Sequence, residues 1–115
     1  MRRAALWLVP MALATAAACG PTPPDTLYVK LGCPRCHGTH RQGNQYGPPL
    51  RDLASHWDSA DEIVRYFRDP EAVIANRPRL QEARARYGLR MPPVQGRSDE
   101  EIQAFAQWLL VGPAH

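Results

Sequence analysis

The chain has 115 residues, of which fourteen are Lys or Arg and eleven are Asp or Glu, giving a formal charge of +3 at pH 7. This length fits a single domain. Two of the basic residues lie at the extreme N-terminus and no basic run is longer than two, so the charge pattern excludes a strongly basic nucleic-acid-binding protein.

The N-terminal end has the order of an export signal. Two arginines precede an uncharged, largely apolar stretch over residues 4–18, which ends on three alanines. The stretch is shorter than the ~20 residues that a membrane-spanning helix needs, and Pro10 interrupts it. We therefore expect residues 1–18 to be a cleaved signal peptide, with an uncleaved anchor helix as the alternative.

Cys19 follows the expected cleavage point and stands apart from the other two cysteines. An odd cysteine in an exported protein calls for an explanation, and a free thiol at such an N-terminus is open to oxidation. We expect Cys19 to be lipidated, which would hold the protein at the outer face of the cytoplasmic membrane or in the periplasm. A plain free thiol is the alternative, because Ala16 stands where bacterial lipoproteins usually have leucine.

A Pro-rich linker over residues 19–24 separates this N-terminus from a domain over 25–115. Pro-rich segments prefer an extended conformation, so the linker would hold the domain away from its anchor. In the domain, the sequence predicts a short helix over 25–32 and then a loop rich in Gly, Pro and Asn over 33–53.

The second half of the chain is expected to be helical. A helix over 59–68 begins with a capping box formed by Ser59 and Glu62, and the Asp-Pro pair that follows ends it. A short helix over 71–76 follows, Pro78 interrupts the pattern, and another helix ends at Gly88. After a loop over 89–97, Ser98 and Glu101 form a second capping box for a helix over 98–111. No segment alternates like a strand, so the predicted fold class is all-α.

Cys33-Pro34-Arg35-Cys36-His37 is the most specific motif in the chain. Cys-x-x-Cys-His predicts covalent attachment of one c-type haem: the two thiols add to the two vinyl groups, and His37 supplies a nitrogen to the iron. Half of a zinc site is one alternative, although zinc needs four ligands. A thioredoxin-like redox pair is another, although that motif belongs in a βαβ setting.

Met91 is the candidate for the second axial position on the iron. Met1 and Met11 would leave with the signal, so Met91 is the one methionine of the mature chain, 54 residues after His37 in a loop rich in Gly and Pro. A lone methionine usually packs in a hydrophobic core, but this loop has little apolar surface to pack against. We therefore favour Met91 as an iron ligand. His56 is the alternative ligand, whereas His40 is too close to His37 to reach the other face.

The chain resembles the class I, mitochondrial-type c cytochromes over nearly the whole mature sequence. The resemblance rests on five features in order, namely Cys33-Pro34-Arg35-Cys36-His37-Gly38, Gly47-Pro48-Pro49-Leu50, Asp69-Pro70, Met91-Pro92-Pro93 and a final helix with Phe105 and Trp108. It implies a small cytochrome c fold of about four to five helices around the haem, with crossing terminal helices. It also implies His37/Met91 coordination and a Pro48 carbonyl that accepts from His37.

The resemblance implies a one-electron carrier that exchanges electrons with redox proteins and needs no small-molecule substrate. A cytochrome subunit within a dehydrogenase or terminal oxidase complex is the alternative. A haem enzyme or sensor with an open sixth position is a third possibility, against which Met91 argues. Trp57 and Tyr46 are candidates for contact with a haem propionate but are expected in the core, and Arg51 is a further, unspecific candidate.

Overall fold

The structure, a computed structural model, describes residues 4–8, 10 and 20–112. Its helices, in chain order, are α1 (Pro24–Lys30), α2 (Pro34–His37), the 3-10 helix η1 (Leu53–Ser55), α3 (Ala60–Arg68), α4 (Pro70–Ile74), α5 (Pro78–Tyr87) and α6 (Asp99–Val111). The described part contains no strand, only an isolated bridge between Asn44 and Gly47. The all-α prediction is confirmed, with six α-helices where four to five were expected.

Proline begins four of the six α-helices, at the first helical position of α1, α2, α4 and α5. This position suits proline because its missing N–H has no intrahelical partner there and its φ is already helical. The sequence predicts a break in the helical pattern at Pro78, but Pro78 is the first residue of α5. The helix ends as expected at Gly88, which adopts the left-handed conformation with φ 70°.

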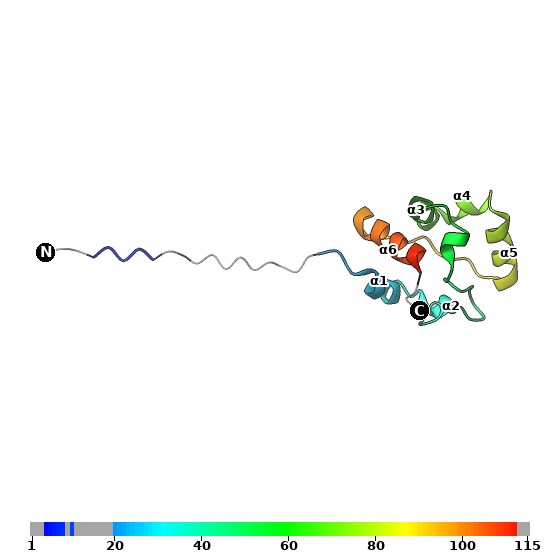
Figure 1. The fold of residues 1–115 in the computed structure, drawn as a ribbon, viewed down its shortest axis with the longest axis horizontal. Coiled ribbons are helices and arrows are strands. Elements are labelled where there is room, and N and C mark those ends of the chain that lie inside the picture. The colour runs from blue at the N-terminus through cyan, green and yellow to red at the C-terminus, as the bar shows by residue number, and fades with distance from the viewer. Residues whose placement is uncertain (1–3, 9, 11–19, 113–115) are drawn as a thin grey trace.

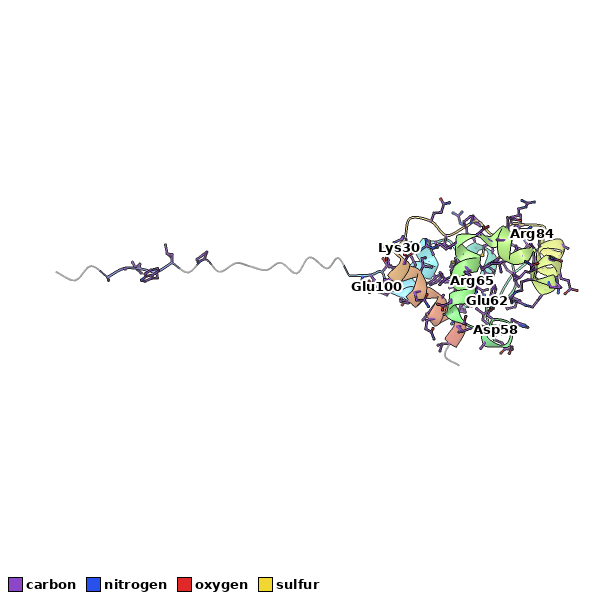
Figure 2. The ribbon with its side chains drawn as sticks, turned by 90° about the horizontal axis from the view of Figure 1, so that it is seen from above. Lys30, Asp58, Glu62, Arg65, Arg84 and Glu100 are labelled. Carbon is purple, nitrogen blue, oxygen red and sulfur yellow. The ribbon has the colours of Figure 1, made fainter. Side chains whose placement is uncertain are left out.

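Serine caps α3 and α6, but neither helix has a complete capping box. The Ser59 hydroxyl accepts from the Glu62 N–H, and the Ser98 hydroxyl accepts from the Glu101 N–H. The two carboxylates do not return the bond to the serine N–H. Glu62 accepts instead from the Asp58 N–H and pairs with Arg77, so this carboxylate joins the start of α3 (Figure 2) to the start of α5.

The core lies between α3 and α6, with α1 packed on α6 (Figure 1). The largest fully buried side chains are Leu27, Ile102 and Phe105. Phe105 stacks on Phe67 of α3 with ring centroids 5.6 Å apart. The two terminal helices of the domain therefore pack together, as the resemblance implied.

Helix α5 lies at the far end of the domain from α1 (Figure 1). It has no buried residue, and its helical contacts are with α4. None of the helices in the described ranges is long and apolar enough to cross a membrane.

Candidate functional site

The two thiols of the attachment motif lie on one short helical segment. Cys33 is the residue before α2 and already has helical backbone angles, and Cys36 lies within α2. Residues three apart on a helix are neighbours, so both sulfur atoms project from the same turn. Both are half-buried free thiols, and burial raises the pKa of Cys33 to about 11.

His37 ends α2 with its ring held by the chain itself. Its Nδ1 lies 2.8 Å from the carbonyl oxygen of Pro48. A carbonyl only accepts hydrogen bonds, so Nδ1 carries the proton and Nε2 keeps a free lone pair. Burial lowers the pKa of His37, which also favours the neutral ring. A neutral imidazole whose second nitrogen is fixed in this way is the form that binds a metal.

The loop that carries Pro48 lies directly against α2, the helix that contains Cys36 and His37. A Cβ on Gly47 would come within 2.8 Å of the Cys36 carbonyl oxygen, so only glycine allows this approach. On the other side, the Tyr28 hydroxyl donates to the Gly38 carbonyl oxygen at 2.6 Å. Helix α1 and the Gly47 loop thus both restrain the segment that ends in His37.

A cavity of about 1340 Å³ opens beside this segment, and its lining includes Cys33, Cys36, His37 and Met91. An adjoining cavity of about 310 Å³ is also lined by Cys33, His37 and Met91. Met91 is half-buried against the core, in the loop after α5. The fold therefore brings the two thiols, the imidazole and the thioether to one cavity, although 54 residues separate His37 from Met91.

The other candidates lie in different surroundings. Trp57 belongs to the core, 7% exposed, whereas Tyr46 is half exposed and lines the larger cavity. Arg51 lines the smaller cavity and donates to the His40 carbonyl oxygen at 3.1 Å. His56 is exposed and also lines the smaller cavity. Cys19 lies outside the described residues.

Three residues line both cavities without having been singled out from the sequence: Tyr66, Arg79 and Leu80. Tyr66 follows Ile63 by three residues, so the helical spacing of α3 contains a signal for it. Leu80 carries the same kind of signal through its helical spacing to Ala83 and Tyr87, whereas Arg79 carries none, because its place beside the cavity depends on how α5 packs.

The donor set fits a covalent haem better than the alternatives. Two thiols match the two vinyl groups of one haem, and an imidazole and a thioether are both side-chain groups that would bind a haem iron. Among residues 4–8, 10 and 20–112, no three His, Cys, Asp or Glu side chains gather to hold a metal ion, which argues against zinc. The absence of strands from the same residues argues against a thioredoxin-like setting.

Searches among curated proteins and among solved structures found no significant match. A family model described as Cytochrome c matches residues 25–111. This match spans most of the chain and includes all four residues that meet at the cavity. The chain therefore belongs to the cytochrome c family, whose members bind haem c covalently and transfer electrons.

Proposed function

We propose that the protein is a class I, monohaem cytochrome that carries one electron at a time, with His37 and Met91 as its axial ligands. The observation that carries this proposal is that His37, with its Nδ1 held 2.8 Å from the Pro48 carbonyl oxygen, and Met91 line the same cavity as Cys33 and Cys36. The haem iron supplies the one-electron Fe(II)/Fe(III) chemistry.

In this proposal the chain's own residues keep the ligands in place during electron transfer. Pro48 holds the His37 ring by its Nδ1 proton, which fixes the direction of Nε2. Met91 would supply the second protein ligand to the iron, which would leave no open site on the iron for a substrate. The protein then exchanges electrons with redox partner proteins and has no substrate chemistry of its own. As a subunit of a dehydrogenase or oxidase complex it would use the same ligands, and the two roles would differ in the partner.

We also propose that residues 1–18 are removed on export and that lipid on Cys19 attaches the protein to the membrane. The alanines before Cys19 support this. The linker would then join the anchor to a fixed point of the domain, because the Thr22 N–H donates to the Glu101 carboxylate at 3.0 Å.

Replacement of the proposed ligand tests the function. In Met91→Ala, we expect the weak near-red sulfur-to-iron band of the oxidised protein to disappear and the reduction potential to fall, because a methionine ligand raises it. We also expect carbon monoxide to bind rapidly to the reduced variant and slowly to the wild type. Absorption spectra, voltammetry and stopped-flow mixing give the three readouts.

Leu80→Ala is the matched control, because it removes apolar volume from both cavities without removing a ligand. It should keep the near-red band. Rapid carbon monoxide binding by the reduced wild type would contradict Met91 ligation and would favour an open-site enzyme or sensor instead.

A further inference from the structure

The chain on the two sides of Met91 is held in different ways. On its C-terminal side, buried Val94 donates its N–H to the Phe67 carbonyl oxygen at 2.9 Å, so this side is fixed to the core. On its N-terminal side, only Gly88, Leu89 and Arg90 separate it from α5, which has no buried residue. The position of Met91 therefore depends on its own packing against the core and on what holds α5.

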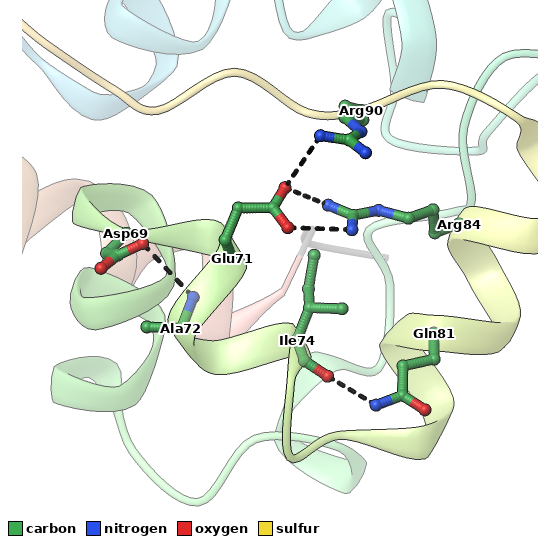
Figure 3. Close-up of polar contacts among 7 residues, drawn as sticks. All are labelled: Asp69, Glu71, Ala72, Ile74, Gln81, Arg84 and Arg90. Carbon is green, nitrogen blue, oxygen red and sulfur yellow. Dashed lines mark hydrogen bonds and ion pairs between the residues drawn. The ribbon is translucent and has the colours of Figure 1, made fainter.

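Besides Leu80, which packs against the core, polar contacts with α4 hold α5 in place (Figure 3). At one end, the Gln81 amide donates to the carbonyl oxygens of Ile74 and Ala75 at 2.9 and 3.2 Å. At the other end, the Arg84 guanidinium donates to both carboxylate oxygens of Glu71 at 3.0 and 2.5 Å.

Glu71 also reaches the residue next to the proposed ligand. The Arg90 guanidinium lies 3.8 Å from the same carboxylate (Figure 3). One side chain thus contacts α5 through Arg84 and the Met91 loop through Arg90.

The element that carries Glu71 is anchored to the rest of the fold. Pro70 and Ile74 of α4 are buried, and the Asp69 carboxylate accepts from the Ala72 N–H at 3.3 Å at its start. We infer that Glu71 is a positioning residue for Met91, acting through Arg84 and Arg90 to hold α5 and the following loop over the cavity. This inference rests on the proposed ligation by Met91.

An isolated ion pair at an exposed site contributes little to stability, but this one differs in two respects. Arg84 binds both oxygens of Glu71 in a fork, which fixes orientation as well as distance, and Arg90 makes the pair a network. No residue of α5 is fully buried and Leu80 is only half-buried against the core, so the network adds to a single partial apolar contact in holding the helix.

Glu71→Gln in the haem-loaded protein tests the inference, since glutamine keeps the size and removes the charge. Amide hydrogen exchange in α5 should become faster. Carbon monoxide should bind to the reduced variant about three- to fivefold faster than to the wild type, because a loosened loop would let Met91 leave the iron more often. Raising the salt concentration should speed binding in the wild type and have little effect in the variant, because salt screens exposed ion pairs.

Two controls remove the same charge without touching the network. Glu82→Gln changes α5 itself, where Glu82 makes no ion pair within the described residues. Asp99→Asn breaks the exposed pair with Arg68 in another part of the fold. Neither should change the rate of carbon monoxide binding.

The results separate this inference from the proposed function. If Glu71→Gln loosens α5 while the near-red band and the carbon monoxide rate stay at their wild-type values, the network is merely structural and the inference is wrong. An unchanged exchange rate in α5 would overturn it as well. A wild type with no near-red band would instead contradict the Met91 ligation on which the inference rests.

Discussion

Gly47 lies so close to α2 that a residue with a Cβ at this position would push the Pro48 loop away from the His37 ring. Its neighbour Pro48 must come within hydrogen-bonding distance of the His37 ring. A Cβ at position 47 would meet the Cys36 carbonyl oxygen at 2.8 Å and the Cys36 Cβ at 3.1 Å. Backbone atoms form part of this contact, so a rotamer change cannot relieve the clash.

We predict that Gly47→Ala separates the Pro48 loop from α2 and weakens the hold on His37. The free energy of unfolding of the haem-loaded protein should fall by about 1–3 kcal/mol, the usual cost of forcing extra volume into a packed site. Guanidinium unfolding followed by the haem absorption measures this change. Gly20→Ala is the control, because a Cβ there meets nothing within 4 Å. Equal stability of the two variants would contradict the prediction.

At the scale of the elements, α1 links α6 to Gly38, the residue that follows His37 at the end of α2. The Tyr28 ring lies against Trp108 of α6 with centroids 5.9 Å apart, and its hydroxyl donates to the Gly38 carbonyl oxygen. Burial is the main reason that the pKa of Tyr28 rises from 10.0 to about 12. Because the folded pKa is the higher one, this contribution to stability is complete below pH 10 and is lost as the pH rises towards 12.

Tyr28→Phe should therefore have two effects. At pH 7 the free energy of unfolding should fall by about 1 kcal/mol, because the hydrogen bond to the Gly38 carbonyl is lost. Between pH 10 and 12 the difference between wild type and variant should shrink. Denaturant unfolding across this range tests both effects, with Tyr46→Phe as a control at a half-exposed tyrosine. If the difference in unfolding free energy between wild type and variant stays constant up to pH 12, the raised pKa of the Tyr28 hydroxyl is contradicted.

At the scale of the whole molecule, the linker and helix α5 lie at opposite ends of the domain. Residues 20–23 lead into α1, and α5 lies at the far end (Figure 1). The Thr22 contact with Glu101 fixes the point at which the linker leaves the domain. An anchor on Cys19 would thus leave α5 and the Met91 loop directed away from the membrane.

We predict that the native protein partitions into detergent and that Cys19→Ser releases it as soluble protein. Stable attachment takes more than one lipid chain, so the mass of the native N-terminus should show a multiply acylated cysteine. The haem spectrum is the internal control, because Cys19 precedes the family match and its replacement should leave the spectrum unchanged. A native protein that is soluble and begins at an unmodified Cys19 would indicate ordinary export.

The sequence by itself determined the features that depend on neighbouring residues. Cys33, Cys36 and His37 are recognisable because haem attachment needs all three within one turn of chain. The serine caps at Ser59 and Ser98 mark their helices because a cap acts on N–H groups two or three residues away. The Cys-x-x-Cys-His motif and most helices are therefore local information.

Only the tertiary structure decided which distant groups meet. Glu62 pairs with Arg77 instead of completing its capping box, and Glu71 of α4 reaches Arg84 of α5 and Arg90 of the loop that follows it. Arg41 is buried with its guanidinium 4.3 Å from the Trp108 ring centroid, in a loop whose sequence suggests exposure. These contacts depend on how the helices pack around one cavity, and no spacing within the sequence encodes that packing by itself.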